Sequence, residues 1–196
     1  MRDKGLYGVI VLAALLGGAL VSLSVPRIAA YGALSGFGDV RSALDDGGAV
    51  EPLRLDAAYL AFEVAEIWLP DDAAILRDKA RIARRLSRLA GKPAGSPVPD
   101  AATWRARAVR DLTEAAVASP ANAFIWALLA DAKLEAGAAA KDVLAELHLA
   151  RLTGPYRAYI DAGLQARMAF RNEFSDTPST LEQIDRLLWR EIGPER

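Results

Sequence analysis

The sequence predicts an all-α protein with one N-terminal transmembrane helix, followed by an antiparallel domain of about seven helices. Two observations lead to this fold class. Residues 6–25 form an apolar run without a charge, and the chain after residue 53 shows helical periodicity without sustained alternation of period two. Proline and glycine residues divide this second part into pieces of helical length. A chain of 196 residues is long enough to bury a sizeable core.

The composition excludes several kinds of chemistry. The chain has no cysteine, a single histidine at position 148 and a formal net charge of −1. Disulfides, thiolate metal sites and multi-histidine metal sites are therefore excluded, and near-neutral charge argues against nucleic-acid binding. We find no nucleotide-binding glycine loop and no serine-hydrolase or zinc-protease motif. We expect no catalytic, cofactor-binding or metal-binding residues, and we expect a protein that is not an enzyme.

Residues 6–25 are expected to cross a bilayer. Twenty helical residues span about 30 Å, the thickness of the hydrocarbon core. Arg2 and Lys4 precede this run, so the positive-inside rule places residues 1–5 in the cytoplasm. The expected location is the bacterial inner membrane, with the main domain in the periplasm.

A cleaved signal peptide is the alternative to this anchor. The run is longer than the roughly 7–15 apolar residues of a signal peptide. The small-residue site at residues 22–24 also lies inside the apolar run, so an uncleaved anchor is favoured. Ala14, Gly18 and Ser22 recur every four residues along it, a spacing that lets membrane helices approach closely. Such residues are also simply common in membrane helices.

Residues 26–52 are expected to form a glycine-rich juxtamembrane linker. Glycines should interrupt any long helix there, at Gly32, Gly36, Gly38, Gly47 and Gly48. Residues 53–196 then form the helical domain.

Each helix of this domain is bounded by a proline, a glycine or a capping residue. Asp71 is a candidate N-cap after Pro70, and Thr177 precedes a proline at the first helical position. Four tryptophans lie on separate expected helices, where we expect them in the core. The expected helices cover residues 53–69, 72–90, 100–118, 122–136, 140–153, 156–174 and 178–192.

Residues 101–155 contain a repeat signature. Pro120 and Pro155 are 35 residues apart, Trp126 and Leu129 form an aromatic–Leu pair, and small or closing residues follow at Ala130, Gly137 and Ala150. This segment resembles degenerate tetratricopeptide repeats, which stack helix pairs and bind partners in a groove. The pattern departs from that family at Lys133 and by one inserted residue near 138–142. An alanine-rich helical bundle with chance proline spacing is the alternative.

The segment from His148 to Tyr156, with Arg167 and a late Leu/Trp helix, adds a second resemblance. It is similar to small membrane-anchored helical-repeat proteins of Gram-negative bacteria that are associated with surface-polysaccharide systems. This resemblance carries over no catalytic residue.

Residues 77–92 hold the most uneven charge cluster of the chain. Seven basic residues accompany Asp78 alone, and an apolar stripe runs beside them. The cluster predicts a surface for an anionic partner, or else a solvated face paired with the acidic residues of the preceding helix, Asp56, Glu63 and Glu66. The basic residues are Arg77, Lys79, Arg81, Arg84, Arg85, Arg88 and Lys92.

These observations favour a membrane-anchored scaffold or adaptor over an enzyme. Its periplasmic domain would bind protein partners, within an envelope or polysaccharide assembly, and residues 6–25 would contact lipid. One alternative is an accessory subunit held in a larger complex through its transmembrane helix. Another is a carboxylate-based enzyme that acts on glycans.

Overall fold

The computed structural model describes residues 3–90 and 99–154, and in these ranges every regular element is a helix. The all-α prediction is therefore confirmed for the described part of the chain. The expected helices at 156–174 and 178–192 lie outside it.

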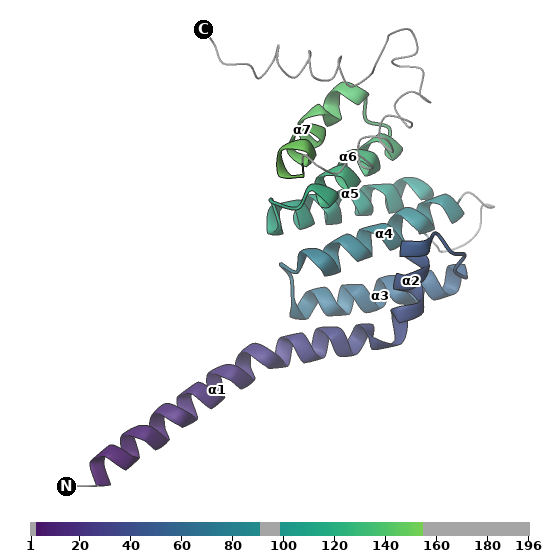
Figure 1. Ribbon diagram of the computed structural model, residues 1–196. Coiled ribbons are helices and arrows are strands. Elements are labelled where there is room, and N and C mark those ends of the chain that lie inside the picture. The colour runs from purple at the N-terminus through teal and green to yellow at the C-terminus, as the bar shows by residue number, and fades with distance from the viewer. Residues whose placement is uncertain (1–2, 91–98, 155–196) are drawn as a thin grey trace, which may run out of the picture.

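The first helix, α1 (Asp3–Leu34), is longer than the apolar run that predicted it. It continues through Pro26, and its first half projects away from the rest of the molecule (Figure 1). Among the described residues it is the helix long and apolar enough to cross a membrane, and its apolar window is not buried by the protein. Near its other end Ala30 and Leu34 are buried where α1 packs against α3.

The expected linker at residues 26–52 is mostly helical, so the prediction that its glycines interrupt helical structure is wrong in most of this range. After α1 come a short 3₁₀ helix, η1 (Ser35–Phe37), and α2 (Gly38–Asp46). A glycine in a helix costs about 1 kcal/mol relative to alanine, and buried contacts such as that of Val40 offset this cost. Gly47 does end α2, because its φ of 72° lies in the left-handed region.

The next four helices begin and end within one residue of the expected bounds. They are α3 (Pro52–Trp68), α4 (Ala73–Leu89), α5 (Ala101–Ala118) and α6 (Ala123–Glu135). The last described pair is η2 (Ala140–Val143) and α7 (Leu144–Thr153), so the expected helix at 140–153 begins as a 3₁₀ turn. The N-cap of α4 is Asp72 rather than Asp71, and its carboxylate accepts the backbone N–H groups of Ala74 and Ile75 at 2.9 and 3.1 Å.

The helices stack in chain order, each against the next, so that α1 packs on α3 and the pile continues from α3 to α7 (Figure 1). A continuous core joins α1 to α6, and a smaller one joins α6 to α7. The ring of Trp104 meets that of Tyr59 edge-on at 4.9 Å in the larger core. Trp68 was also expected in the core, and this prediction is wrong because 46% of its surface is exposed.

One turn geometry recurs at the ends of α3, α5 and α7. The residues that follow these helices are Leu69, Ser119 and Gly154, with φ/ψ of −138/72°, −141/70° and −147/60°. A proline follows each of them in the sequence, and proline disfavours the helical conformation of the residue before it. After the first two turns, Asp72 and Asn122 donate their N–H groups back to Leu69 and Ser119 and cap the next helix. The same helix–turn–helix connection is therefore built twice in the described residues, at Pro70 and at Pro120.

Candidate functional site

The basic residues of α4 do not form one surface. Arg81, Arg84, Arg85 and Arg88 line a groove, whereas Lys79 lies on the opposite, buried side of the helix. Arg77 lies beside the groove, and Lys92 lies outside the described residues. The predicted anionic-partner surface is thus reduced to one row of arginines.

Lys79 is a structural core residue, so its predicted place on the anionic-partner surface is wrong. Its side chain is 1% exposed, and its Nζ donates to Glu66 of α3 and lies 3.3 Å from Oδ1 of Asp111 on α5. Arg110 also donates to that oxygen at 2.8 Å. Burial raises the pKa of Asp111, and the neighbouring Lys79 and Arg110 oppose this shift. These charges join three helices, and the side chains of Lys79 and Asp111 are not accessible to a partner.

The groove has a volume of about 220 Å³ and lies between α2, α4 and α6. Two leucines from α2 and α6 give it apolar walls, and one carboxylate from α6 faces the arginines. The lining residues are Leu44, Arg81, Arg84, Arg85, Arg88, Leu128 and Asp131.

Two arginines hold the carboxyl end of α2 as one wall of the groove. Arg81 donates to the backbone carbonyl of Leu44 and to the carboxylate of Asp45, both at 2.7 Å. Arg85 donates to the carbonyl oxygens of Gly47 and Gly48, just beyond the helix end. Carbonyl groups at the end of a helix lack partners and carry partial negative charge, so guanidinium groups are favourable there.

The other two arginines hold α6 as the opposite wall. Arg84 donates to Asp131 and, at 2.9 Å, to Glu135, while Arg88 donates to the second oxygen of Glu135 at 2.6 Å. Burial would raise the pKa of Glu135, but the hydrogen bonds and charges of Arg84 and Arg88 outweigh it and lower the pKa to about 2. Glu135 is therefore ionised at neutral pH.

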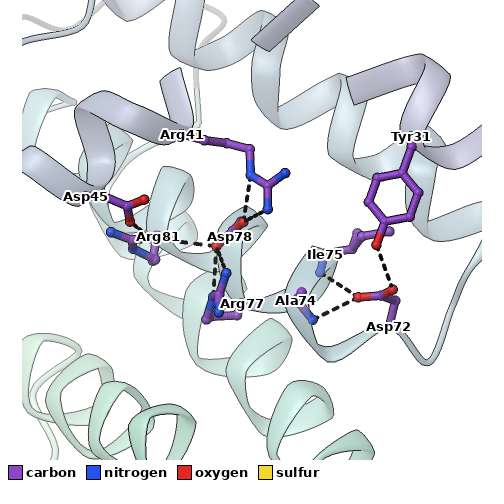
Figure 2. A network of polar contacts seen from close by, with 9 residues as sticks. All are labelled: Tyr31, Arg41, Asp45, Asp72, Ala74, Ile75, Arg77, Asp78 and Arg81. Atoms are coloured by element: carbon purple, nitrogen blue, oxygen red, sulfur yellow. Dashed lines mark hydrogen bonds and ion pairs between the residues drawn. The ribbon is translucent and has the colours of Figure 1, made fainter. Parts of the chain in front are cut away.

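A network around Asp78 fixes α2 on α4, and a separate contact joins α1 to the start of α4 (Figure 2). The buried carboxylate of Asp78 pairs with Arg41 of α2 at 2.9 Å and with Arg77 at 2.7 Å, and Arg81 lies 3.7 Å away. At the other end of the contact, the Tyr31 hydroxyl of α1 donates to Asp72 at 3.4 Å. Residues that follow the apolar run in the sequence therefore contact α4 beside the groove.

The groove face carries an excess of positive charge. Four arginines line the groove against one lining carboxylate, that of Asp131, although the whole chain has a net charge of −1. Arg85 contacts carbonyl oxygens rather than a carboxylate, and Arg88 is 48% exposed. Both guanidinium groups can therefore donate hydrogen bonds to a carboxylate of a partner.

The second interpretation of the basic cluster paired it with acidic residues of the preceding helix, and one of the three named residues makes such a contact. Of the three acidic residues expected from the preceding helix, Glu66 contacts this cluster, through the buried Lys79. The partners of the groove arginines come instead from α2 and α6. Those elements lie more than 35 residues away in sequence, so no local pattern connects them to α4.

The repeat-signature residues lie at the contact between α6 and its neighbours. Trp126 is half-buried, and its Nε1 donates to the carbonyl of Pro120 at 2.8 Å. Gly137 follows α6 with a φ of 102°, which favours glycine. Leu129, Ala130 and Ala150 are buried, and Pro155 lies outside the described residues.

The small residues of the apolar run lie on an open surface. Ala14, Gly18 and Ser22 are exposed, and a Cβ added at Gly18 would meet nothing within 4 Å. The Ser22 hydroxyl donates to the Gly18 carbonyl at 2.8 Å, which satisfies it within the helix.

A cluster of metal ligands is not found in the part of the chain that the structure describes. No group of three or more His, Asp or Glu side chains is placed there to hold a metal ion. His148 is half-buried on α7. Comparison with known proteins found no protein-family model, no curated protein and no solved structure that matches the chain.

Proposed function

We propose that the protein is a single-pass inner-membrane adaptor whose periplasmic, tetratricopeptide-like helical domain binds a protein partner in the arginine-lined groove. The observation that carries this proposal is that the segment leaving the apolar run builds one wall of the groove. Helix α1 packs on α3, and hydrogen bonds from Arg81 and Arg85 hold the carboxyl end of α2 on α4. A partner in the groove would therefore be held at a fixed place relative to the membrane.

The chemistry of the groove favours an acidic segment of a protein. Arginine binds carboxylates with two parallel hydrogen bonds, and such bonds are stronger than neutral ones. Leu44 and Leu128 add apolar surface beside the charges. Of the groove's lining residues, Asp131 is the one carboxylate, whereas a glycan hydrolase needs two facing carboxylates. This composition supports binding over hydrolysis, and an envelope or polysaccharide assembly is the setting we propose.

The test is copurification of crosslinked full-length protein from native membranes. Arg88→Ala should lower recovery of the partner several-fold, because Arg88 is exposed and Glu135 keeps its bond to Arg84. High salt should weaken the complex in the same way. Arg105→Ala on α5 is the matched control and should leave recovery unchanged. Recovery of the protein alone from crosslinked membranes would contradict the adaptor function.

A second candidate is an accessory subunit bound through the anchor itself. The open face of Ala14, Gly18 and Ser22 favours it, because small residues allow close contact between membrane helices. Gly18→Leu should then release the protein from its complex, whereas Arg88→Ala should not. The opposite result would favour the groove.

A further inference from the structure

The outer face of α3 is apolar and uncovered. Leu60, Val64 and Ile67 are 57%, 47% and 77% exposed, and Leu53 near the start of the helix is 75% exposed. The inner face of the same helix is buried, with Tyr59 and other side chains in the core. Exposed apolar patches of this kind mark a binding surface.

The exposed residues follow the spacing of a coiled-coil seam. Leu53, Ala57, Leu60, Val64 and Ile67 are separated by four, three, four and three residues, which is the alternation of the two apolar positions of a heptad. Between Leu53 and Ile67 the seam is about 21 Å long, at 1.5 Å per residue. It can therefore receive another helix along its whole length.

The position of α3 relative to the anchor excludes lipid as the cover of the whole seam. Helices α1 and α3 run in opposite directions side by side (Figure 1), and Tyr31 of α1 contacts Asp72 just beyond α3. At the other end Arg54 donates to the carbonyl of Gly36, after α1 has ended. The Ile67 end of the seam thus lies nearest the apolar run, and the Leu53 end is farthest from it. The structure that covers the seam must therefore be a helix that lies beside α1 and extends away from the bilayer.

We propose that a second copy of this chain occupies the seam, so that two α3 helices pair in parallel. Two copies in one bilayer have the same orientation, and a closed pair then has its two-fold axis along the membrane normal. Equivalent helices that run along such an axis are parallel, and α3 packs beside the end of α1, which continues from the membrane segment. Each residue of the seam then meets its own equivalent. Leucine at two of the heptad's d positions and Val64 at an a position suit a parallel pair.

The charges beside the seam agree with this orientation. Asp56 and Glu63 lie on one flank of the seam, and Arg54, Ala61 and Trp68 lie on the other. In a parallel pair each flank faces the opposite flank of the second helix, so the carboxylates meet Ala61 and Trp68. An antiparallel pair would bring the carboxylate flanks of both copies together, and like charges in contact are unfavourable. The charge pattern therefore selects the orientation that the membrane also imposes.

Disulfide crosslinking gives a direct test, because the chain contains no cysteine of its own. Single substitutions in the full-length chain, Leu53→Cys, Leu60→Cys and Ile67→Cys, should give disulfide-linked dimers when native membranes are oxidised. A parallel pair brings each position within the 4.4–6.8 Å between Cα atoms that a disulfide needs. Thr113→Cys, at an exposed position on α5, is the matched control and should give several-fold less dimer.

Three results would overturn the proposal. The first is dimer formation at the seam no greater than at Thr113. The second is a disulfide between residue 53 of one copy and residue 67 of the other in the double variant Leu53→Cys, Ile67→Cys. Such a bond forms only in an antiparallel pair. The third is crosslinking of Leu60→Cys to a different membrane protein instead of to itself. Adding Val64→Asp to Leu60→Cys should abolish the dimer while the thermal unfolding of the protein still shows a folded domain.

Discussion

The ammonium group of Lys79 lies between carboxylates from two other helices, and each helix depends on the others for this arrangement. Glu66 comes from α3 and Asp111 from α5, and the side chains of Lys79 and Asp111 are 1% and 0% exposed. Removing charges from water costs several kcal/mol per ion, so a buried pair adds little net stability. Removing one partner alone is costly, because it leaves the other charge buried.

Replacing Lys79 by methionine should therefore destabilise the fold strongly. We expect Lys79→Met to lower the free energy of unfolding by about 3 kcal/mol, at the lower end of values for a broken buried pair because Arg110 still contacts Asp111. Denaturant unfolding of the detergent-solubilised protein, followed by circular dichroism, measures the change.

Lys133→Met supplies the matched control. Lys133 also pairs with a glutamate thirteen residues away, but its side chain is 30% exposed and that of Glu146 is 12% exposed. Water reaches the remaining carboxylate more easily than it reaches Asp111, so a smaller loss than for Lys79→Met is expected. Equal losses in the two variants would contradict a structural role for the burial of Lys79.

At the scale of one element, α2 depends on contacts outside itself. It has nine residues and begins with a glycine, and isolated helices shorter than about 12 residues are marginal in water. Arg81 and Arg85 donate to carbonyl groups at its carboxyl end, and Arg41 pairs with the buried Asp78. Helix α4 therefore stabilises α2, and α2 in turn shapes the groove.

Loss of these arginine bonds should loosen α2 while the other helices stay folded. We expect the double variant Arg81→Ala, Arg85→Ala to raise the amide hydrogen-exchange rates of residues 38–46 roughly tenfold or more, since a hydrogen bond to a charged group contributes about 1.5–3 kcal/mol. Mass spectrometry of exchanging peptides measures this. Arg88→Ala, one turn further along α4, removes a contact to α6 and should leave exchange in α2 unchanged. Unchanged exchange in the double variant would show that α2 is stable without these bonds.

The sequence predicted the helices whose ends are determined locally. Pro70 and Pro120 end helices through the residues before them, and Asp72 and Asn122 start the next ones, so α3 to α6 were placed within one residue. The helical state of residues 27–46 depends instead on packing against α3 and α4. Local glycine content could not reveal those contacts.

The groove could be predicted only in part. Its arginines were recognised as a charge cluster, but their partners Asp45, Asp131 and Glu135 lie 36 to 51 residues away in sequence. Lys79 could have been separated from the cluster, because its spacing of four and three residues to Ile75 and Ile82 places it on the apolar face of α4.

At the scale of the whole molecule, the apolar run and the domain share one helix. Helix α1 has an exposed apolar half and an end that is buried against α3, and no break separates the two in the structure. An uncleaved anchor makes the same helix contact lipid at one end and the core at the other. Cleavage near residues 22–24 would leave Ala30 and Leu34 in the core but would free the domain from the membrane.

Labelling of single cysteines should distinguish these two outcomes and give the orientation. With a membrane-impermeant maleimide, Thr113→Cys should react in intact spheroplasts, because α5 lies on the periplasmic side in the proposed orientation. Lys4→Cys should react only after the membrane is permeabilised, since the positive-inside rule places residues 1–5 in the cytoplasm. The natural chain contributes no background because it contains no cysteine. A mature protein that lacks the label at position 4 even after permeabilisation would show that the apolar run is removed, and labelling of position 4 in intact spheroplasts would reverse the orientation.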